Sequence, residues 1–323
     1  MRVAVIGCGA ISKVHIAALL QTGQTICALC DTEKAAAEKT GLDVPVYTDY
    51  RELLHQEKPD CVHICTPHHL HADMCVEALS RGIHVLCEKP VATSMDDLER
   101  VIAAEKASSA TLGVCLQNRY EPNMRVLMEY ASGHGVKAVC GSVFWNRDRQ
   151  YYASGPWRGK WSTEGGGAAI NQALHTLDLV QHLGGMPEFV TAHCFNDHLQ
   201  GVIEVEDTVS ARMETADGKI LTFFATTACG ATFPAELRLR TENHETLVAS
   251  SKFLTLNGQA LSGAPESSCG KEAWGTGHAR LIEDFYRHLE AGLPFPISAA
   301  ESGKSLRLVL SIYASRGERI PVL

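Results

Sequence analysis

The stretch Arg2-Val-Ala-Val-Ile-Gly7-Cys-Gly9-Ala10-Ile11-Ser12 opens the chain and decides its fold class. The apolar run over residues 2–6 predicts a buried strand, and the apolar spacing over residues 12–21 predicts a helix. Between them, Gly7 permits a tight turn, and Gly9 lets the backbone approach a pyrophosphate at the helix N-terminus. This stretch therefore predicts the first strand, turn and helix of a dinucleotide-binding fold.

The second predicted strand, residues 25–30, ends at Asp31. A carboxylate at this position accepts hydrogen bonds from the ribose hydroxyls of NAD and repels the 2′-phosphate of NADP. Lys34 lies close enough in sequence to offer that phosphate a partner. We therefore expect NAD as the cofactor, with NADP as the alternative.

The pattern of apolar residues changes near residue 118 and divides the chain into two parts. Up to about residue 118, short apolar runs alternate with amphipathic segments, which is typical of βαβ units and a doubly wound parallel sheet. After Arg119, Val- and Thr-rich runs follow one another with turn signals such as Asn257-Gly258 between them, which indicates an antiparallel sheet. We expect an α/β protein with two domains: a Rossmann domain over residues 1–118 and an α+β domain over residues 119–323 with a large, mainly antiparallel open sheet.

Composition excludes several classes of protein. The 323 residues carry 29 Lys and Arg against 37 Asp and Glu, a net charge of −8, which disfavours nucleic-acid binding. Apolar runs stay shorter than the ~18 residues of a membrane span, and the N-terminus does not resemble a signal peptide. We expect a cytoplasmic protein with a small-molecule partner and no membrane partner.

Twelve cysteines raise the question of a metal site. The candidate cluster is His68-His69-Leu70-His71 beside Cys61 and Cys65. Spacing alone is weak support, and cysteines within apolar runs behave as small hydrophobic residues. We expect no metal.

Two motifs follow predicted strands of the first domain. Thr66-Pro67 comes after the strand over residues 61–65, and Glu88-Lys89-Pro90 comes after the strand over residues 84–87. Open α/β sheets bind ligands at the carboxyl ends of their strands. Because proline restricts the turn that carries it, Lys89 is interpreted as a positioned amine rather than a solvated surface lysine.

A third motif, Glu164-Gly-Gly-Gly-Ala-Ala-Ile-Asn171-Gln-Ala-Leu-His175-Thr-Leu-Asp178, lies in a predicted helix over residues 168–183. Spacings of i,i+4 and i,i+3 place Asn171, His175 and Asp178 on one helix face. A histidine between an amide and a carboxylate is a candidate for proton transfer. We expect Asp178 to hold the His175 ring.

These motifs, together with His71 after Thr66-Pro67 and Gln117-Asn-Arg119-Tyr120, resemble the glucose–fructose oxidoreductase/inositol dehydrogenase/MocA-type (Gfo/Idh/MocA) family. The resemblance implies an NAD(P)-binding Rossmann domain, catalytic roles for Lys89 and His175 with Asn171, and a homodimer or homotetramer assembled through the C-terminal sheet. The cofactor-binding residues that it implies are Gly7, Gly9, Ala10, Ile11, Asp31, Thr66, Pro67, His71, Glu88, Lys89 and Gln117.

The stretch from Asn146 to Trp161 holds four aromatic and five charged residues, and in this family it would border the substrate cleft. Aromatic rings stack on the C–H faces of pyranoses, while charged groups bind hydroxyls. The expected substrate-binding residues are Lys89, Arg119, Tyr151, Trp157, Arg158, Trp161, Asn171 and His175.

One residue departs from the inositol dehydrogenase pattern, which carries Asp where this chain has Asn171. An amide cannot stabilise an imidazolium as an anion would, so either His175 or Lys89 could be the base. The Asn-Gln form resembles members that act on nucleotide-linked or glycosidic sugars, often at the C3 hydroxyl.

We therefore expect a dehydrogenase that oxidises a secondary sugar hydroxyl or reduces the keto-sugar. One alternative is glycosidic cleavage through a transient keto-sugar with NAD recycled. The other is a non-catalytic sensor on the same fold, which retention of Lys89 and His175 disfavours.

Overall fold

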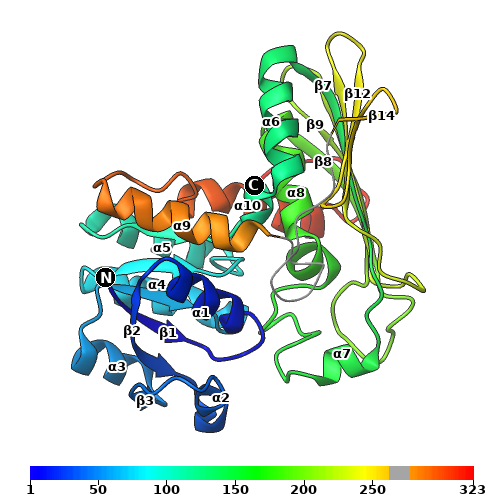
Figure 1. Ribbon diagram of the computed structural model, residues 1–323. Helices are drawn as coiled ribbons and strands as arrows, with labels where there is room; N and C mark the ends of the chain where they lie inside the picture. The colour runs from blue at the N-terminus through cyan, green and yellow to red at the C-terminus, as the bar shows by residue number, and fades with distance from the viewer. Residues whose placement is uncertain (262–275) are drawn as a thin grey trace. The chain divides into compact units, whose positions relative to one another are not determined.

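The computed structural model describes residues 1–261 and 276–323, which form two compact units. In the described ranges, the first unit comprises residues 1–117 and 276–303, and the second comprises residues 118–261 and 304–323. The chain passes from the first unit to the second at the 3₁₀ turn η2 (Gln117–Tyr120), close to the predicted boundary at residue 118. Each unit has its own sheet (Figure 1).

The first unit is built on a six-stranded, all-parallel sheet with the order β3-β2-β1-β4-β5-β6, as predicted for a Rossmann domain. Strands β1, β4 and β5 consist almost entirely of buried residues because helices cover both faces of such a sheet. The strands are β1 (Arg2–Ile6), β2 (Thr25–Cys30), β3 (Val46–Tyr47), β4 (Cys61–Ile64), β5 (His84–Cys87) and β6 (Leu112–Val114).

Side-chain caps define the start of two helices in this unit. The Ser94 hydroxyl accepts a hydrogen bond from the Asp97 amide and so caps the helix that begins at Met95, and Asp49 caps the helix that follows it. The helices are α1 (Ser12–Gln21), α2 (Lys34–Glu38), α3 (Tyr50–Glu57), the 3₁₀ turn η1 (His68–Leu70), α4 (His71–Ser80), α5 (Met95–Ala107) and α9 (Gly277–Glu290).

Helix α9 belongs to the first unit, although the prediction assigned residues 119–323 to the second domain. Its buried face packs against α1. Gly113 in β6 makes room for it: a Cβ there would lie 2.8 Å from the rings of Phe285 and Phe295. An amphipathic pattern shows that a helix has a buried face but not which sheet it covers, so sequence alone did not locate α9.

The second unit contains a nine-stranded, mainly antiparallel sheet, as predicted, with the order β14-β13-β12-β11-β7-β10-β9-β8-β15. One pair, β7 and β10, is parallel. The predicted Asn257-Gly258 turn joins β13 to β14, with both residues at positive φ. The strands are β7 (Val136–Phe144), β8 (Phe189–Phe195), β9 (Thr208–Glu214), β10 (Ile220–Thr226), β11 (Glu236–Thr241), β12 (Thr246–Ala249), β13 (Leu254–Leu256), β14 (Gln259–Ala260) and β15 (Ile320–Pro321).

Helices α6 (Pro122–His134) and α8 (Leu174–Gly184) lie along this sheet (Figure 1). A short helix, α7 (Arg149–Ala153), lies within the stretch from Asn146 to Trp161. Helix α10 (Ala299–Ser315) has residues in both units. None of the helices in residues 1–261 and 276–323 is long and apolar enough to cross a membrane.

The predicted helix over residues 168–183 is two elements. Residues Ala168–Gln172 form a π-helix, η3, and α8 starts at Leu174. Ala173 between them has φ −116° and ψ 7°, outside helical values. Asn171 and His175 therefore lie in different elements. The prediction that they share one face of a regular helix is wrong.

Candidate active site

The glycine turn between β1 and α1 has the shape that a phosphate site requires. Gly7 has φ +90°, and a Cβ there would lie 2.7 Å from the carbonyl carbon of Cys65, so a side chain is excluded. A Cβ on Gly9, by contrast, would meet nothing within 4 Å. Gly9 and Ala10 are exposed and Ile11 is half-buried. The turn therefore leaves an open cradle at the start of α1, which fits a dinucleotide pyrophosphate.

Asp31 is fixed at the end of β2 by two backbone amides. Its carboxylate accepts hydrogen bonds from Cys8 N (2.8 Å) and Glu33 N (2.9 Å). A carboxylate has about four acceptor positions, so two amides still leave capacity for ribose hydroxyls. Asp31 is half-exposed beside the glycine turn, as an NAD site requires.

His71 links the two strand-end motifs of the first unit. It is fully buried, and its ring nitrogens lie 2.7 Å from the carbonyl oxygens of Thr66 and Pro90. Burial lowers the pKa of His71 although both backbone contacts oppose that shift. Thr66, Pro67 and Lys89 remain half-exposed. His71 therefore holds the loops that carry these residues instead of facing a cofactor itself.

Glu88, also predicted to bind cofactor, is buried and turned inward. One carboxylate oxygen lies 3.0 Å from His15 Nε2 and 3.2 Å from His278 Nε2. Burial alone would raise the pKa of Glu88, but the hydrogen bonds and charges of the two histidines hold it well below its usual range. Gln117, from the same predicted set, is buried as well.

In the second unit, Asn171 and His175 share one property. Across residues 164–181 every side chain is buried except these two, which are half-exposed. Two buried carboxylates hold the turn that carries them. Glu164 accepts hydrogen bonds from the Asn171 side-chain amide and from Gly159 N, and Glu206 accepts hydrogen bonds from Gly167 N and Ala169 N, each 2.9 Å long.

Asp178 does not follow the prediction that it holds His175. Its carboxylate forms a bidentate ion pair with Arg119, with both distances 2.7 Å, and accepts a hydrogen bond from Ser305. Asp178 is 1% exposed and Arg119 is 8% exposed. His175 and Asp178 both lie in α8, but the Asp178 carboxylate is occupied by Arg119 and Ser305. The pair Arg119–Asp178 is therefore a buried brace between η2 and α8, and Arg119 presents little surface to a substrate.

In the aromatic loop over residues 146–161, several side chains contact Tyr151. The Tyr151 hydroxyl accepts hydrogen bonds from Arg158 Nη1 and from Gln172 Nε2 (2.8 Å). The guanidinium carbons of Arg158 and Arg147 lie 4.5 Å and 4.9 Å from the centre of the Tyr151 ring. Gln172 directly follows Asn171, so this contact joins the loop to the turn that carries Asn171.

The two tryptophans of the loop, Trp157 and Trp161, have different partners. Trp157 is half-buried and stacks on Arg158, with 4.6 Å between the ring centre and the guanidinium carbon. Trp161 is 46% exposed, donates a hydrogen bond to the carbonyl of Glu204 and packs edge-on against Tyr313. Trp161 is therefore partly accessible from solvent, and rings of this kind can stack on the C–H faces of sugars.

Sequence reasoning missed the residues that support the site from behind. Glu206 had no motif around it, and His15 and His278 stand 73 and 190 residues from Glu88 along the chain. A buried carboxylate needs donors, but the sequence does not say which segments supply them.

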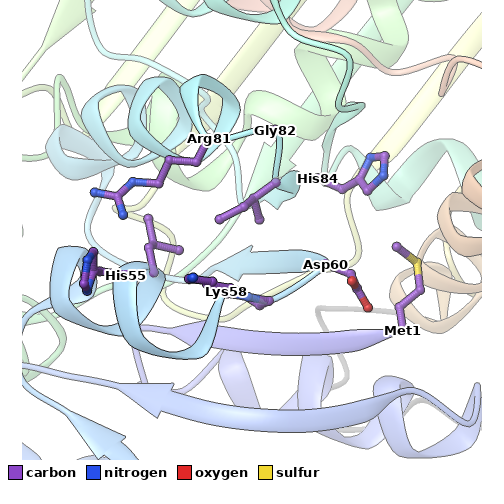
Figure 2. A pocket seen from close by; sticks show the side chains of 10 residues that line it. Met1, His55, Lys58, Asp60, Arg81, Gly82 and His84 are labelled. Carbon is purple, nitrogen blue, oxygen red and sulfur yellow. The ribbon is translucent and has the colours of Figure 1, made fainter.

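A cavity of about 490 Å³ lies at the other end of the parallel sheet, near the amino ends of β1, β4 and β5 (Figure 2). Its lining includes His55, Lys58, Arg81 and His84. The candidate residues of the first unit follow the carboxyl ends of β1, β2, β4, β5 and β6 instead. This cavity is therefore separate from the cofactor cradle.

Comparison with known proteins places both units in one protein family. A family model described as an oxidoreductase family with an NAD-binding Rossmann fold matches residues 1–116, and one described as a GFO/IDH/MocA C-terminal domain matches residues 134–244. D-glucoside 3-dehydrogenase of Escherichia coli K12 is 26% identical over 98% of this chain and 95% of its own.

Two further relatives widen the range of activities. The WlbA dehydrogenase of Bordetella pertussis, solved with NADH and UDP-GlcNAcA, is 27% identical with a TM-score of 0.86 over 100% of this chain and 98% of its own. The 2,7-anhydro-N-acetylneuraminate hydratase of Mediterraneibacter gnavus is 29% identical over 62% of this chain and 54% of its own. Since the family models match more than half of its residues, this chain belongs to the Gfo/Idh/MocA family of oxidoreductases.

Proposed function

We propose that this protein is an NAD-dependent dehydrogenase that oxidises a secondary hydroxyl, with C3 as the candidate position, of a glycoside or nucleotide-sugar, or reduces the corresponding keto-sugar. The observation that carries the proposal is the selective exposure of Asn171 and His175 in an otherwise buried segment. A glucoside 3-dehydrogenase and a dehydrogenase solved with UDP-GlcNAcA among its relatives support the substrate class.

The cofactor in this proposal is NAD, bound on the cradle of Gly7, Gly9, Ala10 and Ile11 with Asp31 on the ribose. The open space at Gly9 and the half-exposed carboxylate of Asp31 support this fit. Thr66 and Pro67 would border the same site, since both stay half-exposed at the end of β4. Bound NAD supplies the hydride acceptor, and the residues of the chain supply binding and proton transfer.

In the proposed reaction His175 takes the proton of the sugar hydroxyl as general base. The Lys89 ammonium donates a hydrogen bond to the same oxygen and stabilises the alkoxide charge that develops. The Asn171 amide nitrogen is committed to Glu164, so its carbonyl oxygen is the side that accepts a hydrogen bond from substrate. Tyr151, Trp157, Arg158 and Trp161 border the sugar in this proposal, whereas the buried ion pair of Arg119 gives it a bracing role.

A second candidate is cleavage or hydration of a sugar through a transient keto intermediate, with NAD regenerated in each turnover. The relative named as a hydratase favours this candidate, because hydration involves no net oxidation. Lys89 and His175 would serve both reactions.

A substrate screen with NAD tests the proposal. Methyl glycosides, UDP-sugars and free sugars are incubated with the protein, and both NADH and sugar products are measured. Net NADH equal to keto-sugar identifies the dehydrogenase, and product without NADH identifies the recycling enzyme. Binding of NAD and sugar without any product would show a sensor and overturn the proposal.

We also propose that the protein assembles as a homodimer or homotetramer through the nine-stranded sheet. Phe144 at the end of β7 is 40% exposed and packs on Phe224 of β10, with ring centres 5.3 Å apart. Phe224 is half-buried, and aromatic side chains on an accessible surface are typical of subunit interfaces. Light scattering should give a dimer or tetramer for the wild type and a smaller species for Phe144→Glu. A monomeric wild type would contradict the assembly.

A further inference from the structure

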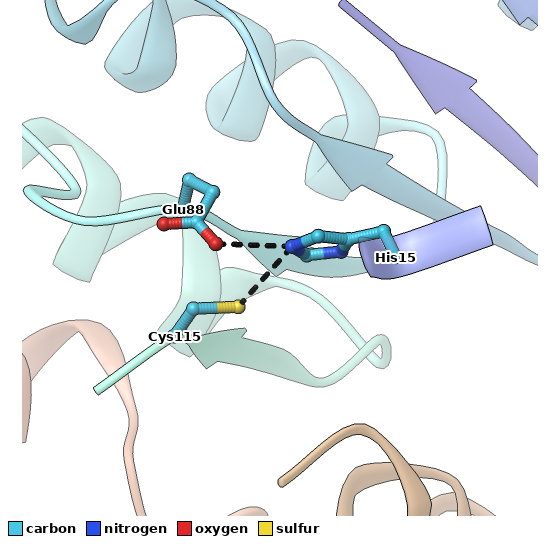
Figure 3. A group of neighbouring side chains, drawn as sticks. All are labelled: His15, Glu88 and Cys115. Carbon is cyan, nitrogen blue, oxygen red and sulfur yellow. Dashed lines mark hydrogen bonds and ion pairs between the residues drawn. The ribbon is translucent and has the colours of Figure 1, made fainter. Parts of the chain in front are cut away.

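Behind Lys89, within the first unit, Glu88 lies in a fully buried cluster of ionisable side chains (Figure 3). His15 comes from α1 and His278 from α9, and the Nε2 atom of each contacts the same Glu88 oxygen. The other Glu88 oxygen lies 3.3 Å from the backbone nitrogen of Lys89. One buried carboxylate therefore joins two helices to the peptide that carries Lys89.

The direction of these hydrogen bonds follows from the charge of Glu88. With its pKa held well below the usual range by the histidines, despite burial, Glu88 is ionised and can only accept. His15 Nε2 and His278 Nε2 must then both carry hydrogens and donate. The carboxylate thus accepts hydrogen bonds from the His15 and His278 side chains and from the Lys89 backbone.

The network continues away from Glu88 through two further side chains. His15 Nδ1 lies 2.8 Å from His63 Nδ1, and His63 Nε2 lies 2.8 Å from the Tyr286 hydroxyl. Burial holds the pKa of His63 well below its usual value, so His63 is neutral and has one donor nitrogen and one acceptor nitrogen. The chain Tyr286–His63–His15–Glu88 is therefore continuous, and His278 and Tyr286 both come from α9.

The same residues could be read as a metal site, since ligand atoms of His15, Glu88 and Cys115 lie within 4.8 Å of one another. The distances favour hydrogen bonds. The 3.0 Å and 3.2 Å separations between nitrogen and oxygen are shorter than the roughly 3.3 Å between neighbouring ligands of a tetrahedral zinc ion. Burial also raises the pKa of the Cys115 thiol well above its usual value, which opposes the thiolate that a metal needs.

We propose that Glu88, His15 and His278 are positioning residues for Lys89. Helix α9 stabilises their arrangement at two points, where His278 contacts Glu88 and where Tyr286 contacts His63. This inference rests on the proposed catalytic role of Lys89. If a partner of Glu88 is lost, a buried carboxylate is left under-compensated and the peptide between Glu88 and Lys89 loses its anchor. Lys89 then samples orientations that do not reach the substrate oxygen.

Chemical labelling of Lys89 tests this positioning without any sugar substrate. The protein is treated with a trace of acetic anhydride, and acetylation of Lys89 is measured by mass spectrometry against exposed Lys106. His278→Leu should raise relative labelling of Lys89 by about tenfold, the ratio for one lost hydrogen bond to a charged group. His278→Gln, which keeps an N–H donor, should stay near wild type, as should the control His288→Leu on the same helix.

Tyr286→Phe, which removes a single oxygen, serves if His278→Leu fails to fold, and we expect a smaller increase in Lys89 labelling. With a sugar that the wild type oxidises, His278→Leu should lower kcat by about tenfold with KM and NADH affinity unchanged, and His278→Gln should restore kcat. A wild type that oxidises no sugar would refute the proposed function, while the labelling ratios still decide the positioning.

Two results would overturn this inference. One is unchanged Lys89 labelling in folded His278→Leu and Tyr286→Phe. The other is purified protein that retains one zinc ion per chain and loses it in Cys115→Ser, because a metal would then hold the cluster.

Discussion

Glu88 in the first unit and Glu206 in the second are both buried carboxylates that support a loop with a half-exposed candidate catalytic residue. Their partners differ. Glu88 faces two histidine side chains, whereas Glu206 accepts from the backbone amides of Gly167 and Ala169 and from the Tyr313 hydroxyl. The pKa of Glu88 is held well below its usual range, while burial raises that of Glu206 to about 7.

The difference shows that burial alone does not set the charge of a carboxylate. Partners that can carry positive charge outweigh desolvation at Glu88, and neutral donors do not outweigh it at Glu206. Glu88, which supports the Lys89 turn, therefore keeps its negative charge near neutral pH. Glu206, which supports the turn that carries Asn171 and His175, changes its charge in that range.

The largest expected effects come from the residues that these carboxylates support. Lys89→Ala should lower kcat by about 10²–10³, the usual loss for a removed charge-stabilising donor, and His175→Ala by a factor of about 10²–10⁴. Both variants should still bind NADH, because neither residue belongs to the glycine turn. Near-normal kcat in both would refute the dehydrogenase assignment.

The pH profiles of the same two variants identify the base. If His175 is the base, its alanine variant loses the acidic limb of the kcat profile and Lys89→Ala retains it. If His175→Ala keeps that limb, Lys89 holds the role instead. The double variant should lose less than the product of the single losses, because both residues act on one proton transfer.

The pH dependence of stability sharpens the contrast between the two carboxylates. Glu206 has its folded pKa raised from 4.5 to about 7, so it favours folding below pH 4.5, and that contribution is lost as pH rises towards 7. The loss is up to about 3 kcal/mol in free energy of unfolding. Urea unfolding at several pH values should show this decline in the wild type and its absence in Glu206→Gln.

Glu88 should behave in the opposite way. Because its folded pKa is lowered, its contribution is present above its unfolded pKa, near 4.5, and is lost as the solution becomes more acidic. Glu88→Gln should therefore remove part of the acid-side loss of stability and leave the slope between pH 5 and 7 intact. Equal slopes in both variants would contradict the contrast.

Asp31 offers a smaller test in the first unit. Asp31→Asn removes the negative charge that disfavours a 2′-phosphate, so NADP should bind about tenfold more tightly while NAD binds more weakly. Titration of both cofactors against wild type and variant measures this. Tighter binding of NADP than of NAD by the wild type would refute the expected NAD preference.

The smallest expected effect concerns the aromatic loop of the second unit. Trp161→Ala should raise KM for the sugar about threefold to tenfold, the range for one stacked ring, with NAD affinity unchanged. We expect an effect on substrate alone because Trp161 is partly exposed and lies outside the glycine turn expected to bind NAD. Unchanged KM with a lower melting temperature would show that Trp161 only supports the loop through Tyr313 and Glu204.

Sequence predicted the parts of this molecule that local patterns determine. The glycine turn and the strands of the parallel sheet follow from residues close together in the chain. The break at Ala173 was not predicted because apolar spacing does not distinguish a π-turn from an α-helix. The partners of Glu88 and Asp178 escaped because they come from segments far apart in sequence, which only tertiary packing brings together.

Measurement of NADH together with sugar product, in wild type and Lys89→Ala, tests the central claim most directly. A glycoside or UDP-sugar that proves to be a substrate is incubated with excess NAD. The account predicts one NADH for each keto-sugar formed by the wild type and a loss of both by about 10²–10³ in Lys89→Ala. Sugar product without net NADH, or equal rates in the two proteins, would contradict it.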